Sequence, residues 1–214
     1  MKLGVNRRDC ESLMVELVSA RRDLVSMLET LDEGDWDKPT LCAGWRVRDV
    51  VSHVACQPDL KTRTMLTGVL RTRDRDALID KLATEGGDRD PVQILANLRR
   101  NIECTRFRGG TTPDSALVEV VVHSLDIAYP NGWDIELPAD RARLALSALV
   151  TLSGPHSGKA RATGFHLDTT DIDWRCGCGD HVRGPANVML LALAGRPVCD
   201  QLTGQGVPEL AGRH

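Results

Sequence analysis

The chain has 214 residues, 42% of them hydrophobic, so it can bury a substantial core and is not expected to be disordered. Its net charge of -3 and pI of about 6.1 argue against nucleic acid or an anionic membrane surface as partner. No apolar run approaches the roughly 20 residues that span a bilayer, and no apolar signal segment follows the first charged residues. Seven scattered cysteines indicate reduced thiols. We therefore expect a cytoplasmic protein.

Two helices are expected in the first quarter of the chain. Between residues 5 and 31, apolar positions recur at spacings of three and four, which predicts a long amphipathic helix. Two glycines and a proline between residues 32 and 44 predict a loop. Valines then resume helical spacing, so a second helix is expected to hold His53.

The middle of the chain contains further helices that begin at prolines. Residues 61–90 are charged and irregular, which suggests one or two short helices with an exposed turn at Gly86–Gly87. Pro91 suits the first turn of the next helix. Thr112 and Pro113 suit the cap and first position of another, so two more helices are expected here.

The last third changes from helical to strand spacing. After a helix over about 138–152, alternation between residues 164 and 182 predicts a small sheet. An apolar helix follows over 186–194, and the remaining stretch LTGQGVPEL suggests a turn and a short terminal strand. We therefore expect a helical metal-binding domain over 1–157 and a small α/β domain over 158–214.

The metal prediction begins with Glu119 and His123. Their spacing of four places both side chains on one helix face, where they can bind one ion together. Such a pair also occurs by chance on helices without metal. Here the surrounding residues are apolar and β-branched, so a buried unpaired carboxylate would be costly and needs a compensating charge.

His53 supplies a third ligand from the other helix. Two imidazoles and one carboxylate leave an open position, which is typical of catalytic zinc. Asp49 and Asp126 lie about one turn from the two histidines and could orient their rings. Both could equally be surface charges or helix caps.

Three segments together resemble the mycothiol-dependent maleylpyruvate isomerase family. They are WDKPTLCAGWRVRDVVSH from Trp36 to His53, VEVVVHSLDI from Val118 to Ile127, and the stretch from VRGPA to LAGR at residues 182–196. The resemblance covers nearly the whole chain. It implies an α+β fold, in which a DinB-like four-helix bundle precedes a small α/β domain, and zinc bound by the residues that correspond to His53, Glu119 and His123.

The resemblance also implies a reaction class. The open metal position would take the thiol of mycothiol and favour its thiolate, which attacks a small electrophile in an isomerase or an S-transferase. Arg196 matches the position of an arginine that the family's isomerase uses, and Arg183 is a second candidate cation for an anionic substrate. Either arginine could instead be a surface charge.

Four alternatives stay open. The protein could bind metal or thiols as a non-catalytic regulator, or it could be a hydrolase that uses zinc-bound water. Another divalent metal could replace zinc, because a His₂Glu set accepts several. Cys176, Cys178 and His181 could form a second metal site, although the two cysteines lack the usual spacing and fit a strand better.

Overall fold

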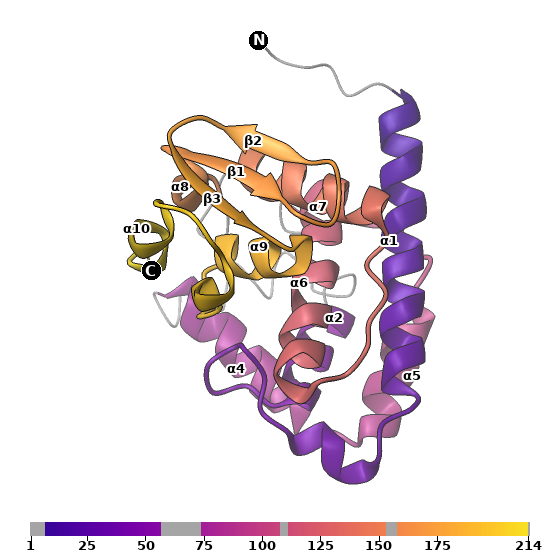
Figure 1. Cartoon of the computed structure of the whole chain (residues 1–214). Coiled ribbons are helices and arrows are strands. Elements are labelled where there is room, and N and C mark those ends of the chain that lie inside the picture. Colours follow the sequence, from indigo (N-terminus) through magenta and orange to yellow (C-terminus); the bar gives the residue numbers. More distant parts are fainter. Residues whose placement is uncertain (1–6, 57–73, 108–110, 153–157, 214) are drawn as a thin grey trace. The chain divides into compact units, whose positions relative to one another are not determined.

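The computed structural model describes residues 7–56, 74–107, 111–152 and 158–213. The density of internal contacts divides the chain into two units, residues 1–135 and 136–214 (Figure 1). Within the described residues, no helix combines the length and apolarity needed to cross a bilayer. The cytoplasmic location stays a prediction.

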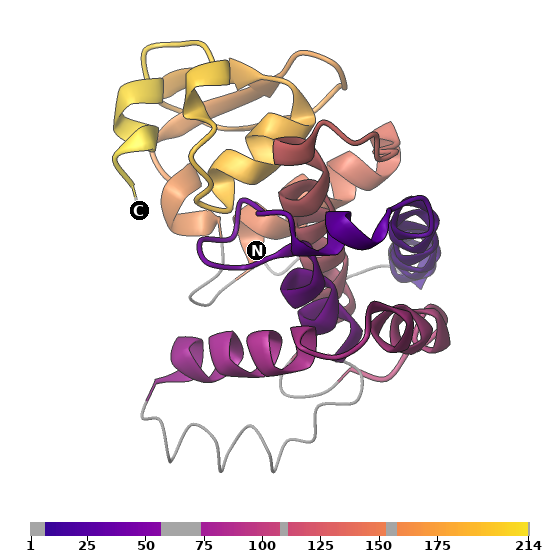
Figure 2. The same cartoon turned by 90° about the horizontal axis from the view of Figure 1, so that it is seen from below.

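Four helices of the first unit form a bundle. They are α1 (Arg7–Leu28), α2 (Val47–Cys56), α5 (Pro91–Arg100) and α6 (Pro113–Asn131). Both α1 and α2 pack against α5 and α6, and Figure 2 shows α1 and α5 nearly end-on and side by side. The interior is aliphatic, with Leu17, Leu24, Leu98 and Leu117 almost completely excluded from solvent. The four predicted helices are therefore confirmed.

Helix α6 is apolar on nearly all sides, since most of its residues between Ala116 and Ala128 are buried. Its start is the predicted one: the Thr112 side chain accepts a hydrogen bond from the Ser115 backbone, and Pro113 occupies the first turn. Gly132 ends the helix in a left-handed conformation, with φ of 65°. The polar residues of α6 thus stand in an apolar setting.

The prediction of an exposed turn at Gly86–Gly87 is wrong. Both glycines are buried at the end of helix α4 (Arg75–Gly87), which packs on α2. A Cβ added at Gly86 would lie 2.0 Å from Ser52 Oγ, and one at Gly87 would lie 2.0 Å from Asp49 Oδ1. The glycines let the two helices approach closely, a role that local sequence does not distinguish from a turn.

The second unit contains a three-stranded sheet in the order β2-β1-β3. Strand β1 (Phe165–Thr169) pairs antiparallel with β2 (Arg175–Gly177) and parallel with β3 (Asp180–Gly184). Helices α7 (Ala139–Thr151) and α9 (Ala186–Leu193) pack on each other. The α+β prediction is confirmed.

The C-terminal segment differs from its prediction. In place of a terminal strand, α10 (Val207–Ala211) forms a short helix with a proline in its first turn. Thr203 makes an isolated bridge to Arg183. Two small helical elements complete this unit, α8 (Lys159–Ala162) and η3 (Cys199–Gln201). The division into domains at residue 157 stays a prediction. The most extensive contacts of α7 are with α8 and α9 of the second unit.

Candidate metal centre

The three predicted metal ligands come together inside the first unit. We call His53 of α2 and Glu119 and His123 of α6 the triad. His53 Nε2 lies 2.7 Å from Glu119 Oε1, and His123 Nε2 lies 3.9 Å from the same oxygen. The three donor atoms lie within 4.8 Å of one another. Helical spacing places Glu119 and His123 on one face, and the packing of α2 on α6 adds His53.

The triad is partly exposed to solvent, although it lies among buried residues. The side chains of His53, Glu119 and His123 are 15%, 28% and 13% exposed. Their neighbours Val50, Val51 and Val120 are almost fully buried. The three side chains are therefore in part open to solvent, while most of their surroundings exclude water.

A second polar group supports His123 from the opposite side of its ring. Asp126 is completely buried, and its Oδ2 lies 2.9 Å from His123 Nδ1. The same oxygen accepts a hydrogen bond of 3.1 Å from the Cys42 thiol. Because a buried carboxylate needs partners, both contacts stabilise Asp126. The carboxylate in turn orients the ring so that Nε2 faces Glu119, which is the predicted role of Asp126.

This setting changes the acidity of His123. Burial by itself lowers the pKa of the imidazole, but hydrogen bonds to Asp126 and Cys42 outweigh burial and raise the pKa from 6.5 to about 10. The two partners thus favour the protonated form of the ring. A metal ion bound at Nε2 would take the place of the proton there.

Cys42 belongs to a loop that precedes α2 and that we call the site loop, residues 38–46. Thr40 Oγ1 donates to the carbonyl of Trp45 and accepts from the amide of Cys42, which closes a tight turn. Gly44 adopts a φ of 79° in this turn, a conformation that suits glycine. The Leu41 amide donates to the carbonyl of Asp126. The site loop is thus attached directly to α6.

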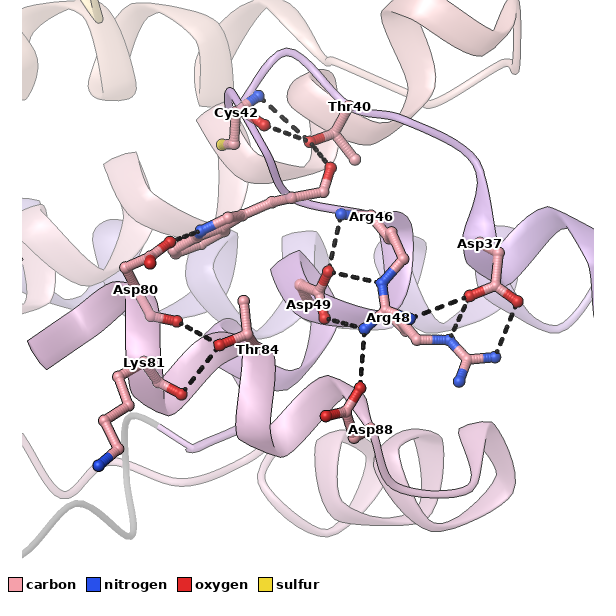
Figure 3. A network of polar contacts seen from close by, with 11 residues as sticks. Asp37, Thr40, Cys42, Arg46, Arg48, Asp49, Asp80, Lys81, Thr84 and Asp88 are labelled. Carbon is pink, nitrogen blue, oxygen red and sulfur yellow. Dashed lines mark hydrogen bonds and ion pairs between the residues drawn. The ribbon is translucent and has the colours of Figure 1, made fainter. Parts of the chain in front are cut away.

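Arg46 attaches the other end of the site loop to α2 and α4 (Figure 3). Its guanidinium donates to both oxygens of buried Asp49 and to Asp88, which follows α4. These carboxylates raise the pKa of Arg46 above its usual value. Asp49 also accepts from the backbone amide of Arg46, so it caps α2. The alternative interpretation of Asp49 as a helix cap is therefore the one that the structure favours over a role beside His53.

Trp45 brings a third ring to the two histidines. Its ring centroid lies 5.3 Å from that of His53 and 6.3 Å from that of His123, and the two imidazoles are 5.2 Å apart. The indole Nε1 donates to Asp80 of α4. Neither Trp45 nor Cys42 was predicted as a site residue. The signal in the sequence that could have identified them is their place in a glycine-containing turn just before the helix of His53.

The two predicted arginines belong to the second unit. Arg183 lies on β3, and its Nε is 3.2 Å from Asp168 Oδ2 on β1. Arg196 follows α9 and donates to the carbonyl of Ala194. The roles of both arginines in catalysis stay predictions.

The second candidate metal site does not form in the described part of the chain. Cys176, Cys178 and His181 do not belong to either group of potential metal ligands found there. The ring of His181 instead lies beside that of His166, its partner on β1, with centroids 4.6 Å apart and the ring planes tilted by 48°. Cys56 lies one turn after His53, a spacing that would let its thiol approach the metal as a fourth ligand, but its side chain lies outside the described residues.

The chemistry of the triad fits a divalent metal. Two imidazole nitrogens and one carboxylate oxygen are ligands that zinc accepts, and three protein ligands leave a position for a further molecule. The second group in the described residues, formed by Cys42, His123 and Asp126, uses the opposite nitrogen of His123. Because hydrogen bonds within that group already satisfy Asp126, the triad fits a metal better.

The bundle and its triad define a helical protein with a candidate metal centre, and comparisons place it in a family. Residues 17–128, more than half of the chain, match the family model described as the mycothiol maleylpyruvate isomerase N-terminal domain. The chain therefore belongs to the mycothiol maleylpyruvate isomerase family, as its sequence motifs predicted. No curated protein sequence matches the chain.

Solved structures extend the likeness to the whole fold. A crystal structure of the mycothiol-dependent maleylpyruvate isomerase matches with a TM-score of 0.61 and 15% identity, over 91% of this chain and 92% of that chain. A histidine-to-alanine mutant of that enzyme matches over the same shares, with a TM-score of 0.61 and 14% identity. The fold, including a helical first part and a small α/β part, is thus that of the isomerase.

Proposed function

We propose that this protein is a metal-dependent enzyme that uses mycothiol to attack a small electrophile, as an isomerase or an S-transferase. The observation that carries the proposal is the meeting of three donor atoms from α2 and α6 on a partly exposed face of the bundle. Family membership supports the choice of mycothiol. Zinc is the metal proposed, because it combines an N and O ligand set with an open position.

Each residue of the centre has a distinct part in this proposal. His53, Glu119 and His123 would hold the metal, and the carboxylate of Glu119 would offset part of its charge. When bound, the metal would favour the thiolate form of mycothiol, the nucleophilic form. Asp126 keeps His123 oriented through Nδ1, and the Cys42 thiol stabilises Asp126. The apolar neighbours of the triad exclude water and so strengthen these interactions.

The reaction follows from the chemistry of a thiolate. In an isomerase, the thiolate adds to a cis double bond, the new single bond rotates, and elimination returns the thiolate with the trans product. In a transferase, the adduct is released. A negative charge that develops on the substrate would need a cation, and Arg196 or Arg183 is proposed to supply it.

Metal analysis tests the centre directly. The purified wild type is expected to hold about one zinc ion per chain after dialysis, whereas His53→Ala is expected to lose it. Zinc-free wild type that takes up no added zinc or cobalt would refute the metal centre. A His53→Ala variant with full metal content would refute the assignment of the ligands.

Product formation tests the use of thiol. The zinc-loaded protein is incubated with a panel of cis-enoic acids and alkylating electrophiles, with and without mycothiol, and products are identified by mass spectrometry. Isomer or conjugate that requires mycothiol supports the proposal. Hydrolysis of esters or amides without mycothiol would favour the hydrolase, and tight mycothiol binding without any product would favour a regulatory binder.

A further inference from the structure

The surroundings of the triad include an aromatic surface that metal binding alone does not need. The Trp45 indole is tilted by 56° to the ring of His53 and by 27° to that of His123, and its centroid lies within 6.3 Å of both. With the two imidazoles it forms a triangle of rings beside the partly exposed donor atoms. A molecule bound to the triad would therefore lie close to the indole.

Contacts at the ring and at the backbone hold this indole in position. Its Nε1 donates a hydrogen bond of 2.6 Å to the Asp80 carboxylate on α4. A hydrogen bond from an N–H group to a carboxylate is stronger than one between two neutral groups. Its backbone is held in the site loop by Thr40 and, one residue later, by Arg46 (Figure 3). Contacts at both the ring and the backbone thus hold the Trp45 indole in this position.

We infer that the Trp45 indole forms one side of the ligand site at the triad and gives that site a preference for ligands with a flat aromatic or conjugated group next to the sulfur. An indole offers a large, rigid apolar face, and ring pairs attract each other beyond the effect of buried area. Asp80 is a positioning residue, because it holds the indole but does not contact the ligand. The inference rests on the proposed function, since it requires a thiol to bind at the triad.

The experiment compares an aromatic with an aliphatic thiol. The full-length protein is loaded with cobalt, and its visible spectrum is followed during titration with benzyl mercaptan and with 2-mercaptoethanol. Wild type is expected to prefer benzyl mercaptan. Trp45→Ala is expected to lower this preference about tenfold, a size consistent with removal of a large aromatic contact. Its cobalt content is expected to match that of the wild type.

Further variants separate the effect of the indole face from the effect of Asp80, which holds the indole. Trp45→Phe retains an aromatic face and is expected to keep most of the preference. Asp80→Ala removes the acceptor for the indole and is expected to lower the preference about threefold. Asp80→Asn retains an acceptor oxygen and should restore the preference. The matched controls are Trp133→Phe, a second tryptophan of the same unit, and Glu85→Gln on α4, and both should behave as wild type.

The outcomes separate this inference from the proposed function. If Trp45→Ala loads cobalt and keeps the wild-type preference, the inference is wrong and the proposed function stands. If wild type loads cobalt but binds neither thiol, both fail. Should Trp45→Ala not fold, Trp45→Leu replaces it, and an unchanged preference in that variant would likewise overturn the inference.

Discussion

Two pairs of histidines lie close together in the described part of the chain, and the two pairs have different surroundings. His53 and His123 lie in the bundle with ring centroids 5.2 Å apart, and His166 and His181 lie on the sheet of the second unit with centroids 4.6 Å apart. The bundle pair shares Glu119 and belongs to a group of three potential ligands. The sheet pair belongs to no such group among the described residues.

The difference shows that proximity of imidazoles does not by itself make a metal site. In the bundle, a buried carboxylate orients one ring and a second carboxylate lies between the two donor nitrogens. On the sheet, the two rings are neighbours because β1 and β3 pair in parallel register. The anionic partners and the burial therefore distinguish the candidate centre from a surface pair.

Of the variants that compare the two histidine pairs, Glu119→Gln should change the metal content most. The amide removes the anionic ligand while it retains the shape of the side chain, so metal is expected to fall from about one ion per chain to near zero. His181→Ala, the matched change on the sheet, is expected to keep full occupancy. Metal content is measured after dialysis against a weak chelator. Loss of metal from His181→Ala with retention in Glu119→Gln would reverse the comparison.

Arg196→Ala tests whether an arginine of the second unit contributes to the reaction. If Arg196 stabilises negative charge on the substrate, kcat for the thiol-dependent reaction should fall about 100-fold, the typical effect of losing one such group. Arg183→Ala, at the other candidate arginine, is measured in the same way, and its loss also removes the ion pair with Asp168. The assay measures kcat and metal content in parallel. Unchanged kcat in both variants would refute a role for either arginine.

Asp126→Asn tests whether the carboxylate that orients His123 increases the affinity of the triad for zinc. The amide is neutral and orients His123 less strongly, so zinc affinity should fall about 10- to 100-fold, as for other residues that orient metal ligands. Asp168→Asn changes a carboxylate near the sheet pair and should leave zinc affinity unchanged. Competition with a chromogenic chelator measures both. Equal affinities in the two variants would contradict the proposed role of Asp126.

Gly87→Ala tests how much the close packing of α4 against α2 contributes to stability. The added Cβ would meet Asp49, so the free energy of unfolding should fall by about 2 kcal/mol, as in an overpacked core. Gly34→Ala is the control, because nothing lies within 4 Å of its added Cβ. Urea denaturation followed by circular dichroism measures both variants. A Gly87→Ala variant as stable as the control would mean that α4 moves away from α2 at little cost.

Several features were predictable because they depend on neighbours along the chain. Pro113 after Thr112 marked the start of α6, and the spacing of Glu119 and His123 placed them on one face. The incorrect predictions concerned long-range contacts. Gly86–Gly87 has the composition of a turn, but it is buried because α4 lies against α2. The last segment has strand-like residues, yet it forms a helix after a single bridge to Arg183.

The sequence by itself determined the helices of the bundle and the family of the chain, and it named the three candidate ligands of the triad, because periodicity, caps and ordered motifs can be read along the chain. Only the tertiary structure decided what surrounds the triad. The hydrogen bond from Cys42 to Asp126 joins residues 84 positions apart, and the one from Trp45 to Asp80 joins residues 35 positions apart. Such contacts depend on how a loop folds back over two helices, and no pattern of neighbouring residues encodes that path.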